Sequence, residues 1–161
     1  PSGIDVNQVL SDTPLLFSKE HGAKKLPFSL DSYLLIIDTG VVGITKHTLE
    51  HVKDNLKTYK PYIDELGSIT KKVIKPLKEK NIDLIGEYMY KAHSLLQKIG
   101  VSHEKNDEVV ELCKNNNAKG AKLTGGGAGG CCICLCDTKE NALKIQDKLK
   151  EKGYLSWMVT V

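Results

Sequence analysis

Residues 122–131 have the sequence KLTGGGAGGC, and this stretch decides how the rest of the chain is interpreted. Five of the six positions in 125–130 are glycine, and Ala128 is the exception. Each glycine in place of alanine costs about 0.5–1 kcal/mol in chain entropy, so five of them need a positional reason. Glycine permits positive φ angles, which lets backbone N–H groups converge on an anion such as phosphate. A flexible turn between two strands is the alternative, although a turn needs only one or two glycines.

The segments on either side of this loop are predicted to be strands. Residues 121–123 precede it, and the apolar run CCICLC at 131–136 follows it. The loop has no GK[ST] ending and no helix after it, which excludes a P-loop and a Rossmann fingerprint. We interpret the cysteines of this run as small hydrophobic residues of a buried strand. Alternate strand residues point to opposite faces, so the run is a poor zinc site.

Farther from the loop, the hydrophobic pattern predicts helices and strands in turn. The YLLIID run at 33–38 predicts a central strand that is covered on both faces. Pro61 is expected to start a helix, and Pro76 to kink or end it. This order favours an α+β fold, a two-layer sandwich with helices packed on one face of a mostly antiparallel sheet. The remaining predicted helices cover 3–10, 45–56, 82–99, 104–115 and 139–152, and the remaining strands cover 15–18, 24–28 and 154–161.

Composition limits the functions that the chain can have. With 161 residues, 40% of them hydrophobic and 27% charged, it has the size of one soluble globular domain. All 23 residues counted as Lys+Arg are lysine, so a bound anion must be held by backbone amides or point charges. The net charge of +3 is not interleaved with aromatic residues, and no apolar run approaches the roughly 20 residues of a membrane span. We therefore expect a cytoplasmic protein that binds neither nucleic acid nor membrane.

A second motif, PSGID at residues 1–5, gives the glycine loop a context. In this order, the two motifs resemble those of the GHMP kinases, named for galactokinase, homoserine kinase, mevalonate kinase and phosphomevalonate kinase. The KLTG sequence, IGVSHEKNDEVVELC at 99–113 and TGVVGIT at 39–45 resemble mevalonate kinases in particular. The resemblance covers essentially the whole chain and implies the C-terminal portion of such an enzyme. It implies that 1–30 ends the N-terminal domain, with the catalytic-aspartate helix and a strand pair, and that 31–161 is the C-terminal domain.

The resemblance also implies a reaction and the residues that perform it. The reaction is ATP-dependent phosphorylation of the primary hydroxyl of mevalonate. Asp5 matches the family's catalytic base, which suits an alcohol that must lose a proton as it attacks the γ-phosphoryl group. Ser2 and Thr45 match residues on the substrate side, although a helix cap is an alternative role for both. The phosphate loop matches Gly125, Gly126, Gly127, Ala128, Gly129 and Gly130.

Other features of the family lie N-terminal to the aspartate motif and do not occur in these residues. They are a GLGSSA-like nucleotide loop, a lysine near the substrate hydroxyl, and the glutamate and serine that hold Mg²⁺. We therefore expect no metal ligand in this chain, an upstream half in the parent protein, and no detectable activity from these residues alone. The alternatives are a phosphomevalonate kinase or galactokinase-like enzyme, and a non-catalytic module with the same fold. Isoprenoid diphosphate inhibitors and a homodimer are further partners that the resemblance suggests.

Overall fold

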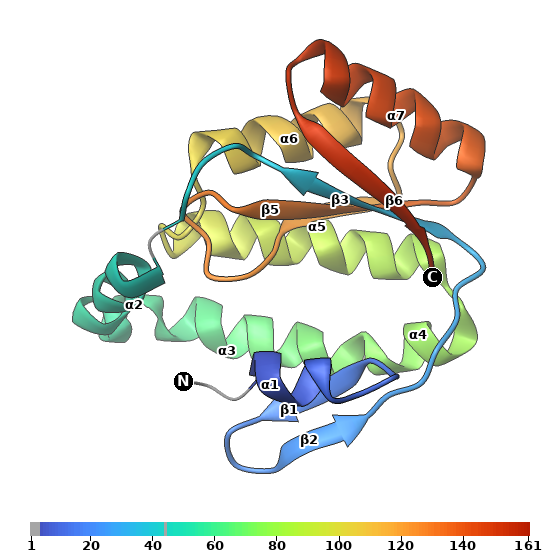
Figure 1. The fold of residues 1–161 in the computed structure, drawn as a ribbon. Coiled ribbons are helices and arrows are strands. Elements are labelled where there is room, and N and C mark those ends of the chain that lie inside the picture. Colours follow the sequence, from blue (N-terminus) through green and yellow to red (C-terminus); the bar gives the residue numbers. More distant parts are fainter. Residues whose placement is uncertain (1–3, 44) are drawn as a thin grey trace.

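The centre of the molecule is an antiparallel sheet with the strand order β4-β5-β3-β6 (Figure 1). The computed structural model describes residues 4–43 and 45–161, without the side chains of Asp5 and Thr45. Strand β3 pairs with both β5 and β6, so that Ile36 lies between Ile133 and Trp157. A separate hairpin joins β1 to β2. The strands are β1 (Leu15–Ser18), β2 (Gly22–Lys25), β3 (Tyr33–Asp38), β4 (Gly120–Leu123), β5 (Cys131–Cys136) and β6 (Leu155–Thr160).

Helices lie on both sides of this sheet, as Figure 1 shows. Helices α6 and α7 cover one face, whereas α5 packs beside the edge strand β4, with α3 and α4 beyond it. The predicted α+β class and antiparallel sheet are confirmed. The helices are α1 (Ile4–Val9), α2 (Thr45–Asp54), α3 (Leu56–Lys72), α4 (Ile74–Glu79), α5 (Ile82–Lys98), α6 (Glu104–Asn115) and α7 (Lys139–Glu151).

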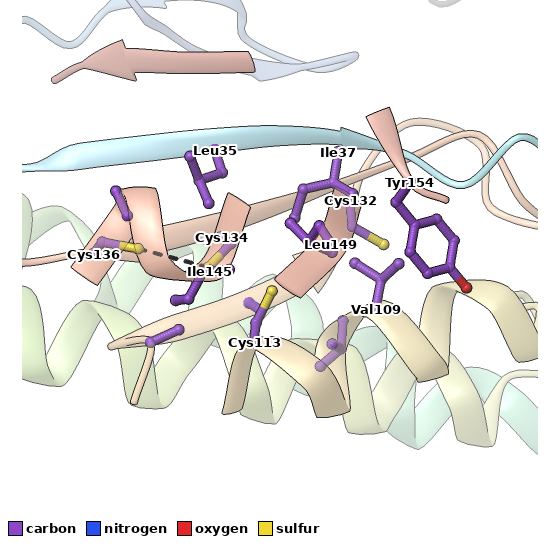
Figure 2. Close-up of a cluster of buried hydrophobic side chains, with 14 of the residues drawn as sticks. Leu35, Ile37, Val109, Cys113, Cys132, Cys134, Cys136, Ile145, Leu149 and Tyr154 are labelled. Atoms are coloured by element: carbon purple, nitrogen blue, oxygen red, sulfur yellow. Dashed lines mark hydrogen bonds between the residues drawn. The ribbon is translucent and has the colours of Figure 1, made fainter. Parts of the chain in front are cut away.

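The main core lies between the sheet and the pair α6 and α7 (Figure 2). Leu35 and Ile37 of β3 are fully buried there, and the alternation of β5 places the thiols of Cys132, Cys134 and Cys136 on the same face. Burial raises the pKa of the Cys132 thiol to about 11, so it stays protonated at neutral pH. These cysteines therefore act as small hydrophobic residues, as the sequence indicated. The core thiols are Cys113, Cys132, Cys134 and Cys136, all of them buried and free.

The opposite face of β3 is only partly covered within this chain. Leu34 and Ile36 are half-buried, and Trp157 beside Ile36 is 54% exposed. The prediction that β3 is covered on both faces holds only in part, because Leu34 packs against a second buried cluster, formed by Leu30, Ile85 and Leu135, whereas Ile36 lies beside the exposed Trp157. A continuous apolar run predicts two buried faces, but it does not tell whether the same chain supplies the second cover.

The two prolines of the helical region behave differently. Pro61 lies inside α3, which already begins at Leu56, so the predicted start is wrong. We attribute the continuation to packing of α3 against α5, which outweighs the hydrogen bond that proline removes. Pro76 lies in the first turn of α4, where a proline is tolerated. The helix end that we predicted at Pro76 occurs three residues earlier, at Val73, which separates α3 from α4.

Close backbone contact between α5 and β4 gives the first prediction. A Cβ at Gly86 would overlap the carbonyl oxygen of Lys119, so Gly86→Ala should lower the free energy of unfolding by about 1–3 kcal/mol. Urea unfolding measures this loss. Gly67→Ala is the matched control, because Gly67 is exposed in α3 with nothing within 4 Å of an added Cβ. It should be neutral or stabilising by up to about 1 kcal/mol, and equal losses for both variants would contradict the packing argument.

Candidate functional site

The second half of the glycine loop is bound to the segment that follows β3. The loop is closed at its base, where Thr124 N donates to Cys131 O over 2.9 Å. Gly130 N donates to Val41 O over 2.7 Å. The backbone N–H and the hydroxyl of Thr39 both donate to Gly130 O, over 3.0 and 2.6 Å. These bonds fix the end of the loop against residues 39–41.

The side chain of Asn106 holds the loop from the side of α6. Its Nδ2 donates to Gly129 O, and its Oδ1 accepts from Gly129 N, both over 3.0 Å. Asn106 is completely buried, and its Oδ1 also accepts from His103 N as part of the N-terminal cap of α6. Ala128 N donates to Val101 O over 2.8 Å, just before this helix. The loop therefore rests on two separate parts of the fold.

Positive φ angles explain why most loop positions are glycine. Gly125 has φ 74°, Gly127 77°, Gly129 113° and Gly130 65°, and Ala128 also adopts φ 57°. A Cβ at Gly127 would overlap Val101 O, and one at Gly129 would overlap Val41. At these two positions both the backbone angle and the space exclude a side chain.

In the first half of the loop, residues 125–127, the backbone N–H groups have no hydrogen-bond acceptor among the described residues. Gly125 and Gly126 are exposed, whereas Gly127 is buried, so the first two N–H groups are the accessible ones. An anion at this point would meet fixed N–H groups without losing any hydrogen bond inside the protein. This is the chemistry by which backbone loops hold phosphate.

Segment 39–43 connects the loop to α2. A Cβ at Gly43 would contact Gly127 O, so the loop lies directly against the approach to α2, which begins at Thr45. The structure thus brings together the predicted phosphate loop and the backbone beside Thr45. Ser2 and the side chains of Asp5 and Thr45 lie outside the described part of the structure, and their roles stay predictions.

His93 of α5 is a buried polar residue that the sequence analysis did not single out. Its Nδ1 accepts from Leu123 N over 3.3 Å, and its Nε2 lies 3.0 Å from Asp107 Oδ1. Because Nδ1 accepts a hydrogen bond, the proton lies on Nε2 and the ring is neutral. Burial lowers the pKa of His93, despite the opposing effect of Asp107. His93 thereby satisfies an N–H group of the edge strand next to the loop.

Sequence reasoning missed Asn106 and His93 for different reasons. Asn106 is the third residue of α6, the position whose side chain completes a capping box, and it does so here by accepting from His103 N. Its second role depends on Gly129, which is 23 residues away. A single buried histidine within a helical pattern gives no signal of its partner.

The described residues contain no cluster of three or more His, Cys, Asp or Glu side chains that could hold a metal ion. The free amides of Gly125, Gly126 and Gly127 fit a phosphate group. None of the described helices is both long and apolar enough to cross a membrane.

Comparison with known proteins identifies the family. Residues 73–155, about half of the chain, match the domain described as GHMP kinases C terminal. The chain belongs to the GHMP kinases. Mevalonate kinase of Pyrococcus abyssi is 31% identical over 157 residues, which are 92% of this chain and 46% of that enzyme. Galactokinase of Thermosipho africanus is 38% identical over 87 residues, which are 53% of this chain and 24% of that enzyme.

Solved structures of GHMP kinases confirm the fold. The crystal structure of L. major mevalonate kinase in complex with R-mevalonate has a TM-score of 0.90 and 25% identity. The likeness covers 99% of this chain and 53% of that one. The chain thus spans about half the length of that enzyme and less than half of its curated relatives.

The double hydrogen bond of Asn106 gives the second prediction. Asn106→Ala leaves both backbone groups of Gly129 without their partner, at about 1–3 kcal/mol for each unpaired buried group. The free energy of unfolding should fall by more than about 2 kcal/mol in urea titrations. Asn116→Ala is the control, since its amide makes a single bond to Leu112 O at the other end of α6. Similar losses in the two variants would show that Asn106 is only a cap.

The neutral state of His93 gives the third prediction. Because its pKa is lowered in the folded state, the unfolded state binds more protons once the pH falls below its ordinary value of 6.5. The free energy of unfolding should therefore decrease between pH 7 and pH 5. His93→Gln should reduce this pH dependence, whereas His21→Gln in the exposed β1–β2 turn should keep it. Urea unfolding at several pH values distinguishes the two, and an unchanged slope in His93→Gln would rule out the neutral buried ring as its source.

Proposed function

We propose that this chain is the C-terminal portion of a mevalonate kinase, which transfers the γ-phosphoryl group of ATP to mevalonate and yields 5-phosphomevalonate. The observation that carries the proposal is the set of free amides at Gly125, Gly126 and Gly127 in a chain that belongs to the GHMP kinases. The substrate assignment is supported by the extent of similarity. The match to the P. abyssi mevalonate kinase extends over 92% of the chain, whereas the match to galactokinase is confined to 53%.

In this proposal, the loop stabilises charge on the transferred phosphoryl group. Its N–H groups are held in place because residues 128–130 are bonded to Asn106, Val101 and Val41. Donors that are fixed before the reaction need no reorganisation when negative charge develops, which makes them effective. The chain contains no arginine, so backbone dipoles take the part that a guanidinium group plays in many phosphate sites.

The remaining roles are assigned by the family resemblance. Asp5 accepts the proton of the substrate hydroxyl as its oxygen attacks the γ-phosphorus of ATP, and ADP leaves. Ser2 and Thr45 lie on the substrate side. We assign the Mg²⁺ ligands and the nucleotide loop to a part of the enzyme outside residues 1–161. Residues 1–30 then belong to the N-terminal domain and 31–161 to the C-terminal domain of a cytoplasmic enzyme. Isoprenoid diphosphate inhibition and a homodimer stay expectations.

A substrate panel on the whole protein that contains this chain tests the assignment. Mevalonate, phosphomevalonate, galactose and homoserine are each supplied with ATP and Mg²⁺, and kcat/KM is measured. Mevalonate should be preferred, and residues 1–161 alone should show no turnover. A preference for another acceptor would identify a different GHMP kinase, and no turnover with any acceptor would favour a non-catalytic module.

The proposed base gives the fourth prediction. In the whole protein, Asp5→Asn removes the proton acceptor, and kcat should fall about 100-fold or more while nucleotide affinity stays nearly constant. Steady-state kinetics and nucleotide titration measure the two effects. Asp12→Asn is the control, because Asp12 is an exposed carboxylate whose partner is Lys25 in the hairpin. Unchanged turnover in Asp5→Asn would remove Asp5 from the mechanism.

A further inference from the structure

The imidazole ring of His51 in α2 contacts two other parts of the fold through a single nitrogen atom. Its Nε2 lies 3.1 Å from the carbonyl oxygen of Ile99, in the turn after α5, and 3.1 Å from the hydroxyl of Tyr59 in α3. The rings of His51 and Tyr59 are also in contact, with their centroids 5.5 Å apart. His51 therefore joins α2 to α3 and to the end of α5.

The C-terminus of α5 determines which atom donates in this contact. Ile99 follows the last residue of α5, and its carbonyl oxygen accepts no backbone hydrogen bond among the described residues. Because a carbonyl oxygen can only accept, the Nε2–H group of His51 is the donor. The partial negative charge at the end of a helix favours a donor at this point. A Cβ at Gly100 would lie 2.7 Å from Nε2, so this glycine leaves room for the ring.

Helix α2 depends on this bond because the rest of the chain covers little of it. Among the side chains of 46–54, only Thr48 and Val52 are half-buried, and the others are exposed. Its main neighbour among the helices and strands is α3, the next helix along the chain. The bond from His51 to Ile99 O is therefore a main link between α2 and the part of the molecule that carries the sheet.

The turn after α5 also holds the glycine loop. Ala128 N donates to Val101 O over 2.8 Å, two residues after the carbonyl group that binds His51. Just before α2, Gly43 lies against Gly127 O. Helix α2 is thus fixed relative to the loop at two points, Gly43 before its first turn and His51 in its second turn.

We propose that His51 is a positioning residue for the acceptor substrate, because it fixes α2 beside the glycine loop. This inference rests on the proposed function, in which Thr45, the first residue of α2, lies on the substrate side. The bond to Ile99 O holds α2 in the orientation that binds the acceptor. Without the bond, α2 adopts this orientation only part of the time, and the apparent affinity for the acceptor falls in proportion.

Steady-state kinetics of the whole protein, with ATP and the acceptor that the substrate panel selects, test this role. His51→Leu removes the donor and should raise the KM of the acceptor about three- to tenfold, while kcat and the KM of ATP change less than about twofold. Loss of folded enzyme would instead lower the apparent kcat and leave KM unchanged. His51→Gln should retain most of the wild-type KM, because its amide group can still donate. The matched control is His47→Leu in the same helix, where the side chain is 74% exposed and KM should stay constant.

Hydrogen exchange followed by mass spectrometry tests the anchor without substrate. His51→Leu should accelerate exchange of the α2 amides about three- to tenfold and leave α7 unchanged. Tyr59→Phe keeps the bond to Ile99 O and should change exchange less than about twofold.

The outcomes separate this role from the proposed function. Wild-type protein that is inactive with every acceptor would refute both. With active wild-type protein, an unchanged acceptor KM in His51→Leu, or α2 exchange no faster than in His47→Leu, would overturn the role of His51 alone. An effect of Tyr59→Phe as large as that of His51→Leu would overturn Ile99 O as the anchor.

Discussion

The candidate phosphate site depends on a side-chain amide that takes the place of a neighbouring strand. Asn106 donates to and accepts from the backbone of Gly129, as a paired strand would, but from the N-terminus of a helix. Both groups are buried, so neither can exchange this partner for water. The position of the loop is thereby tied to α6, and α6 is tied to the sheet through the core of Figure 2. Moving the loop therefore requires breaking the two hydrogen bonds between Asn106 and Gly129.

The two halves of the loop differ in how their backbone hydrogen-bonding groups are used. Residues 128–130 use their hydrogen bonds for attachment to Val101, Asn106 and segment 39–41. Residues 125–127 keep theirs free. A loop that was attached everywhere would have no donors left for a ligand, and one that was free everywhere would have to be ordered on binding. The five glycines satisfy both needs: close approach excludes a side chain at Gly127 and Gly129, whereas Gly125 and Gly126 have an exposed backbone.

Much of this arrangement could be predicted from the sequence where the signal is local. The strands β3 and β5 follow from short apolar runs, and the entropic cost of five glycines predicted the positional reasons that the positive φ angles and close backbone contacts now give. The family resemblance added the likeness to mevalonate kinases, which the comparisons support. Long-range partners could not be predicted in this way. Asn106 bonds to Gly129, 23 positions away, and His93 bonds to Leu123, 30 positions away. Neither an asparagine nor a histidine indicates by its type which distant residue it will bond to. Pro61 shows a second limit of prediction from local sequence. Proline usually ends a helix, but α3 continues through Pro61, which we attribute to its tertiary packing.

A phosphate site made of main-chain N–H groups, as we propose for this loop, would be insensitive to many chemical changes. Such donors do not titrate, so acid, alkali and reagents that modify lysine leave them unchanged. Where a side chain fits, exchanging one amino acid for another also preserves the N–H donor, unless the new residue is proline, whose nitrogen carries no hydrogen. At Gly126, which has an ordinary backbone angle and an exposed position, many replacements would keep the donor while altering what surrounds it. Drift at that position could therefore adjust which molecules approach the loop without abolishing its hold on the anion.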